Sequence, residues 1–185
     1  MESSKSENNH IPQWNLSSFQ DTVLKRQIWL GGELKEQLFD PVRQQWLIAQ
    51  PEELIRQALL HYMTSVLGYP INLISLEKEL ALLPHVQLNA KRIPQRRIDI
   101  LCFGQNIHSF HEVYPLLMVE CKAVRLTDKV LQQVIGYNDY VCAYFIAVAN
   151  STSIQTGWYD KQKEDYCFVE GLPSFQDLMN ALRQR

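Results

Sequence analysis

The sequence predicts an α/β protein built on a mixed β-sheet with helices on its faces. Three observations predict it. An amphipathic helical segment follows Pro51, three strand-like segments come next, and a second helical segment leads to the apolar run AYFIAVAN at 143–150. Short connections join antiparallel strands, whereas a helical crossover joins parallel ones. We therefore expect an antiparallel meander of three strands and a fourth strand parallel to the third.

The composition fits a single globular domain. The chain has 185 residues, 46% of them hydrophobic, which is enough for a real core. Residues 1–24 are expected to be disordered or extended, because MESSKSENNH has no apolar residue after Met1; the single domain then spans 25–185. No apolar stretch approaches the roughly 20 residues that span a bilayer, and no signal-peptide core is present. We therefore expect a cytoplasmic protein without membrane contact.

The elements of the first half follow from turn and helix signals. Residues 26–49 resemble short strands, with a hairpin turn at Asp40-Pro41. Pro51 suits the first turn of a helix, acidic residues follow it, and Gly68 ends it. Residues 71–80 alternate in the manner of a strand.

The second half of the sequence contains the same kinds of strand and helix signals. Strands are expected at 97–103 and 115–124, separated by the polar connection 104–114, and Thr127 can cap a helix over 128–142. The apolar run at 143–150 is typical of a central strand buried on both faces. Two more strands, around WYD and YCFVE, precede a helix capped by Ser174. Four cysteines without a CxxC pair are expected to be free thiols, two of them in apolar strands.

The segment LLMVECK (116–122) carries the first candidate site. Glu120 and Lys122 share one face of a strand, and Asp99 on the preceding strand can lie beside Glu120 across the ladder. Neighbouring carboxylates in apolar surroundings repel and lose solvation, and a divalent cation removes both problems. Oxygen ligands suit Mg²⁺ or Mn²⁺, and an ammonium group can position a water or stabilise phosphate charge. An isolated ExK pattern, however, is more often the solvated end of an ordinary strand.

Two helices add side chains to this candidate site. Gln133 and Tyr137 are one helical turn apart and share a face, where they can bind a phosphate or a water; the alternative is an ordinary amphipathic helix edge. Glu52 falls roughly 80° from the centre of its helix's apolar face, so it can border the sheet with Arg56 beside it. An exposed helical ion pair explains these two residues equally well. Glu53 is expected in solvent.

Nucleic-acid contact must rest on a local patch, because the net charge is −2. The segment KRIPQRR (91–97) is the candidate, with Lys91, Arg92, Arg96 and Arg97. The alternative is a solvated charged loop, which most charge runs are.

The motifs RIDI, LLMVECK and QVIGY together resemble the PD-(D/E)xK nuclease superfamily, in its form with a Gln-x-x-x-Tyr helix motif. More narrowly, FDPVRQQW, PEELIRQALLHYM and GYPINLISLEKEL resemble the N-terminal nuclease domain of the type I restriction enzyme R subunit, in its small stand-alone bacterial form. The resemblance covers residues 25–172. It implies a restriction-endonuclease-like αβββαβ core with extra N- and C-terminal β hairpins.

The resemblance also implies roles for individual residues. Asp99 and Glu120 would bind the metal with the Cys121 carbonyl as a further ligand, and Lys122 would position the attacking water. Gln133 and Tyr137 would form the helix pair that orients a phosphate. The first-helix motif would be Pro51, Glu52, Glu53 and Arg56. One departure is Ala-Asn-Ser at 149–151, where relatives carry Thr-Asn-Gly, and it concerns a flanking loop.

We therefore expect a Mg²⁺- or Mn²⁺-dependent nuclease that hydrolyses DNA in restriction, defence or DNA processing. The sequence stops short of a translocating motor, so no ATPase of its own is expected. Arg56 and the basic residues of 91–97 are the expected DNA contacts, and a homodimer or a partner protein would supply targeting. The alternative is a catalytically silent nucleic-acid-binding or assembly module with the same fold, which the mild negative charge and the missing motor favour.

Overall fold

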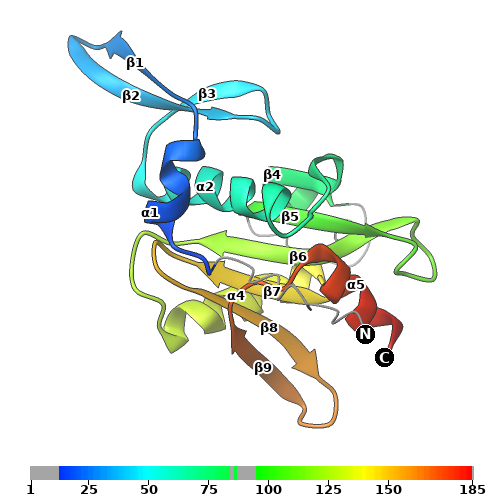
Figure 1. The fold of residues 1–185 in the computed structure, drawn as a ribbon. Coiled ribbons are helices and arrows are strands. Elements are labelled where there is room, and N and C mark those ends of the chain that lie inside the picture. Colours follow the sequence, from blue (N-terminus) through cyan, green and yellow to red (C-terminus); the bar gives the residue numbers. More distant parts are fainter. Residues whose placement is uncertain (1–12, 84–85, 87–94, 185) are drawn as a thin grey trace, which may run out of the picture.

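The computed structural model describes residues 13–83, 86 and 95–184, which form a six-stranded sheet, a three-stranded sheet and the helices packed on them (Figure 1). The larger sheet has the order β4 (Ile74–Glu79), β5 (Arg97–Gln105), β6 (Val113–Cys121), β7 (Phe145–Ala149), β8 (Ile154–Asp160), β9 (Asp165–Glu170). Strands β4, β5 and β6 are antiparallel neighbours, and β7 lies parallel to β6. The predicted meander and parallel fourth strand are confirmed.

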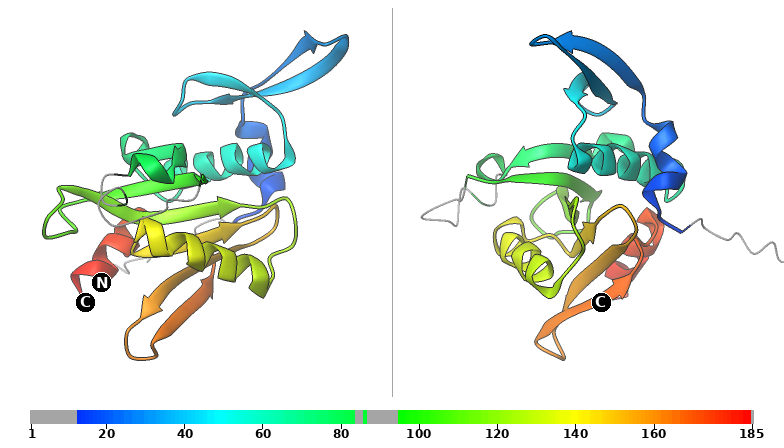
Figure 2. Two further views of the ribbon diagram at one scale, coloured as in Figure 1. Left: turned by 180° about the vertical axis from the view of Figure 1, so that it is seen from behind. Right: turned by 90° about the vertical axis from the view of Figure 1, so that its left-hand side faces the viewer.

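Helices α2 (Pro51–Ser65) and α4 (Asp128–Val141) cover opposite faces of this sheet (Figure 2). The alternation of β6 explains why. Leu117 and Val119 belong to the apolar cluster that includes α2, whereas Met118 belongs to the cluster that includes α4. A strand that buries both faces is predominantly apolar, as β7 is over its whole length and β6 is up to Glu120 near its end. The order α2, β4, β5, β6, α4, β7 is the predicted αβββαβ arrangement, so the mixed α/β fold class is confirmed and is consistent with a restriction-endonuclease-like core.

The element ends differ from the sequence expectation in small ways. The strand expected at 71–80 is shorter, because short 3₁₀ turns at Ile71–Leu73 and Leu80–Leu82 enclose β4. Thr127 holds the N-cap position of α4, but its side chain makes no capping hydrogen bond. Ser174 forms a full capping box with Asp177 at the start of α5 (Phe175–Arg183).

The N-terminal part of the chain corrects one expectation. Residues 13–24 were expected to be disordered or extended, but they contain α1 (Leu16–Phe19) and a 3₁₀ turn (Gln20–Thr22). Trp14 is the reason: its buried indole donates to the Asn150 carbonyl at 2.7 Å and stacks on Phe19. Burying a large aromatic ring with its N–H paired offsets the entropy of ordering this segment. Residues 1–12 lie outside the described part of the chain.

A separate three-stranded sheet follows, with β1 (Lys25–Leu30), β2 (Glu33–Asp40) and β3 (Gln45–Ile48). It projects beyond α2 (Figure 1) and is anchored by the fully buried Leu38. The predicted hairpin at Asp40-Pro41 is present between β2 and β3, where the Asp40 carboxylate accepts the N–H groups of Val42 and Arg43. In the part of the chain described, no helix is long and apolar enough to cross a membrane.

Candidate active site

The centre of the candidate site lies where β5 begins and β6 ends. Ile100 pairs with Val119 across the two strands, so Asp99 and Glu120 are the next residues along each strand. The backbone N–H of Cys121 donates to Asp99 Oδ2 at 2.7 Å, which ties the aspartate to the end of β6. Glu120 is buried, with 9% of its surface exposed. The antiparallel register thus brings two carboxylates together although they are far apart in sequence.

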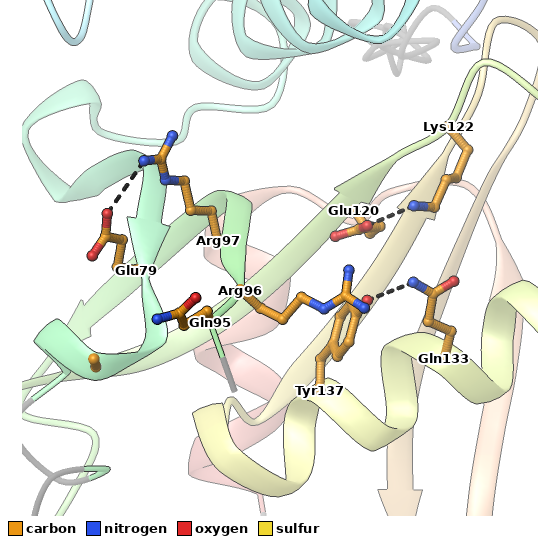
Figure 3. A pocket seen from close by; sticks show the side chains of 9 residues that line it. Glu79, Gln95, Arg96, Arg97, Glu120, Lys122, Gln133 and Tyr137 are labelled. Carbon is orange, nitrogen blue, oxygen red and sulfur yellow. Dashed lines mark hydrogen bonds and ion pairs between the residues drawn. The ribbon is translucent and has the colours of Figure 1, made fainter. Parts of the chain in front are cut away.

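Lys122 lies immediately beyond β6 and turns back toward the sheet. Its Nζ donates to Glu120 Oε1 at 2.7 Å (Figure 3). Its backbone N–H donates to the Ala149 carbonyl at the end of β7. The strand ladder therefore fixes the main chain of Lys122, while its ammonium group is fixed by Glu120. An ammonium group held beside two carboxylates can neutralise charge that develops on a phosphate.

A cavity of about 680 Å³ opens in front of Glu120 and Lys122. Gln133 and Tyr137 line it from α4, where the Gln133 amide donates to the Tyr137 hydroxyl at 2.5 Å (Figure 3). Arg96, whose guanidinium lies 5.9 Å from the centre of the Tyr137 ring, closes another side. The two helix residues and the ExK strand therefore face one space, which is large enough for a phosphodiester segment.

Two of the remaining candidates lie at the rim of this region. Glu52 is exposed, and its Oε1 accepts a long hydrogen bond of 3.4 Å from the N–H of Ala123, just after Lys122. Arg97 lines the cavity and pairs with Glu79 at 3.3 Å. Lys91 and Arg92 lie outside the described residues.

Asp99 and Arg56 are not among the residues that line the cavity. Arg56 is buried and pairs with Asp99, Glu53 and Glu77. The expectation that Glu53 points into solvent is wrong: its side chain is 11% exposed and also accepts from the Gln57 amide. The helical wheel failed here because Arg56 is itself buried, and its guanidinium draws Glu53 inward.

The surroundings of Asp99 and Glu120 shift the pKa values of the charged groups at the site. Burial, and then the charge of Asp99, raise the pKa of Glu120, despite the hydrogen bond from Lys122. Burial likewise raises the pKa of Asp99 against the opposing effects of Arg56 and the Cys121 N–H. For Lys122, burial lowers the pKa, but the bond to Glu120 and the nearby carboxylates outweigh it, so its pKa is raised. Ionising either carboxylate in this site therefore carries a cost that a nearby cation would relieve.

A stability prediction follows from Glu120. A carboxyl group whose pKa is raised in the folded protein destabilises it when ionised, and this destabilisation disappears as the pH falls through the raised pKa. Glu120→Gln should therefore raise the melting temperature at neutral pH in EDTA, by roughly 2–4 °C if the change is about 1 kcal/mol. Calorimetry checks this, and the difference should shrink near the pKa of a free carboxyl group. A lower melting temperature for the variant at neutral pH would contradict it.

The residues present fit a hard divalent cation that keeps most of its waters. Among the described residues, no three His, Cys, Asp or Glu side chains form a ready metal cage. Mg²⁺ is commonly held by one or two carboxylates plus water and substrate oxygens, so Asp99 and Glu120 suffice. The Cys121 thiol is buried in the apolar cluster that includes α2, and burial raises its pKa, so it is no thiolate ligand. Only the main chain of Cys121 is available to the site.

The structure adds Glu77, which sequence reasoning missed. Its carboxylate lies 2.6 Å from Arg56, and its backbone has φ +51° within β4. Nothing in the alternation of ISLEKE distinguishes Glu77 from an ordinary exposed strand residue. The sequence signal for Glu77 is indirect. Arg56 lies on a buried helix face, and a buried guanidinium requires carboxylate partners.

Comparison with known proteins assigns most of the chain to a family. The family described as the N terminus of the type I restriction enzyme R protein (HSDR_N) matches residues 51–173, from the start of α2 to just beyond β9. No curated protein and no solved structure gives a significant match. The matched range contains Asp99, Glu120, Lys122, Gln133 and Tyr137. Because the match covers well over half of the chain, the protein belongs to the family of the type I restriction enzyme R protein N terminus, which fits a PD-(D/E)xK nuclease-like domain.

Proposed function

We propose that the protein is a divalent-metal-dependent nuclease that hydrolyses phosphodiester bonds in DNA. The observation that carries the proposal is the convergence of Asp99, Glu120 and Lys122 at the ends of two paired strands, next to a cavity lined by Gln133 and Tyr137. Membership of a restriction-enzyme family points to a restriction- or nuclease-related role and supports DNA as the substrate.

Each side chain has a defined part in this proposal. Asp99, Glu120 and the Cys121 carbonyl would hold Mg²⁺ or Mn²⁺, which when bound would supply positive charge to the phosphate and lower the pKa of a water. Lys122, fixed by Glu120, orients the attacking water and stabilises the charge that grows on the phosphate oxygens. The Gln133–Tyr137 pair orients a non-bridging phosphate oxygen from the opposite wall.

The DNA backbone would approach along the basic wall of the cavity. Arg96 and Arg97 line that wall, and Lys91 and Arg92 belong to the same basic segment. Because the net charge of the chain is only −2, a few local arginines can still attract phosphates. Binding through them releases counterions, so affinity for DNA should fall as salt rises.

The proposal predicts cleavage that requires both the metal and Asp99. With Mg²⁺ or Mn²⁺ the protein should cut at least one form among duplex, single-stranded, nicked and modified DNA, and EDTA should stop it. Asp99→Ala should lose cleavage together with calorimetric binding of Mn²⁺. Asp139→Ala is the matched control, because it removes an exposed carboxylate from α4 and should change neither measurement.

Two results would count against metal-dependent catalysis at this site. Retained cleavage by Asp99→Ala would remove the metal mechanism. DNA binding without any metal site that depends on Asp99 and Glu120 would favour the silent binding module. A homodimer or a partner that supplies targeting stays a prediction, and sedimentation of the purified chain with and without DNA tests the former.

A further inference from the structure

Arg56 gathers three carboxylates from three elements of the fold. Its Nη1 lies 2.6 Å from Glu53 Oε2 on α2 and 2.6 Å from Glu77 Oε1 on β4, and its Nη2 lies 2.8 Å from Asp99 Oδ1 on β5. The residue is 6% exposed. A guanidinium buried with both terminal nitrogens on carboxylates is poorly placed to meet a DNA phosphate, which was the role expected for it.

The contacts of Arg56 fix the orientation of Asp99. Oδ1 accepts from Arg56 and Oδ2 accepts from the Cys121 N–H, so both oxygens have a rigid donor. A carboxylate oxygen has two lone pairs, and each oxygen of Asp99 thus keeps one for a further partner. The plane of the carboxylate is set before any ligand arrives, which is what a precise metal site requires.

Glu53 and Glu77 compensate the positive charge that Arg56 places beside Asp99. A single arginine beside Asp99 would cancel the negative charge that attracts a cation. Glu53 and Glu77 offset the guanidinium, so that the cluster of Arg56 with its three carboxylates keeps an excess of negative charge. Arg43, 3.7 Å from Glu53, and Arg97, 4.0 Å from Glu77, each have a closer carboxylate partner, Asp40 and Glu79 respectively.

Glu77 contacts Arg56 from an unusual backbone conformation. Leu76 pairs with Ile100 and Lys78 pairs with Ile98, but Glu77 between them has φ +51°, a region that residues with a side chain rarely adopt. Such a conformation persists where the surroundings fix it, often at functional sites. In this conformation the Glu77 carboxylate forms its ion pair with Arg56.

We propose that Arg56, anchored by Glu53 and Glu77, is a positioning residue that sets the Asp99 carboxylate for a divalent cation and does not itself contact DNA. The proposal rests on the proposed function for the role of Asp99 as a metal ligand. It adds two acidic residues and one basic residue that act through Asp99 without touching the substrate.

Calorimetric titration of the DNA-free protein with Mn²⁺ tests it. Glu77→Gln keeps the shape of the side chain and removes its charge, and its position is partly exposed, so the variant should fold. Its affinity for Mn²⁺ should be roughly tenfold weaker, with unchanged stoichiometry. Arg56→Lys keeps the charge but cannot bridge three carboxylates, so it should weaken Mn²⁺ binding as well. Glu170→Gln, an exposed carboxylate on β9, is the control and should match the parent.

A second readout separates positioning from DNA contact. In EDTA, the affinity of Arg56→Lys for a fluorescent DNA duplex should equal that of the parent. In cleavage, Glu77→Gln should need more Mn²⁺ for half-maximal rate but approach the parent rate at saturation. A folded Glu77→Gln with parent-like Mn²⁺ affinity would overturn the proposal, as would weaker DNA binding by Arg56→Lys in EDTA with unchanged metal affinity. If the parent itself binds no Mn²⁺, the proposed function fails as well.

Discussion

Lys122→Ala should slow DNA cleavage by roughly 10²–10³ while leaving the metal in place. The Lys122 ammonium is fixed by Glu120 at 2.7 Å and by a main-chain bond to β7, so it is preorganised next to the expected phosphate. Removing one such electrostatic group typically costs roughly 10²–10³ in rate, or about 3–4 kcal/mol of transition-state stabilisation. The Mn²⁺ affinity should not fall, because the two carboxylates remain and a competing cation is gone.

The combination of readouts makes this test specific. Single-turnover cleavage at saturating Mn²⁺, measured beside calorimetric Mn²⁺ binding, separates Lys122→Ala from Asp99→Ala, which should lose both. Lys161→Ala, in the exposed turn between β8 and β9, removes the same charge and serves as control. A parent-like rate for Lys122→Ala at saturating metal would show that Lys122 has no part in the chemical step.

Asn138→Ala should cause the largest loss of stability among the substitutions considered. The buried Asn138 side chain donates to the Ala143 carbonyl at 2.9 Å and accepts from the Ala143 N–H at 2.8 Å, which joins the end of α4 to the start of β7. Leaving two buried backbone groups unpaired costs about 2–4 kcal/mol, or roughly 5–15 °C in melting temperature for this chain length.

The same substitution should also affect the site indirectly. Asn138 follows Tyr137 on α4, so a frayed end of the helix would disturb the Gln133–Tyr137 wall before the strands are affected. Thermal unfolding followed by circular dichroism measures the main effect. Asn180→Ala, an exposed asparagine on α5, should stay within about 0.5 kcal/mol of the parent. A melting temperature for Asn138→Ala equal to that of this control would refute the assignment.

The parts of the fold that sequence predicts well are those governed by alternation and helical period. The pattern of β5, β6 and β7 predicted which strands are buried, their directions, and the encounter of Asp99 with Glu120. These follow from the period of two along a strand and from the crossover rule.

The parts that sequence missed depend on long side chains and on special backbone angles. Arg56 lies among apolar neighbours of α2, and no helical wheel indicates whether its guanidinium is paired inside or lies in solvent. Glu77 adopts a left-handed backbone conformation, although the position carries neither of the residues, glycine or asparagine, that usually indicate one. The ordering of residues 13–24 depended on one tryptophan that finds a distant carbonyl on Asn150.

The hydrogen bond between Cys121 and Asp99 would be hard to detect by mutational scanning. The donor that holds Asp99 Oδ2 is the main-chain N–H of Cys121, which every residue except proline supplies. Replacing Cys121 by other amino acids would therefore report only on the fit of its thiol in the core. Position 121 would therefore tolerate small apolar residues. Only the proline substitution would remove the hydrogen bond to Asp99 and reveal its contribution.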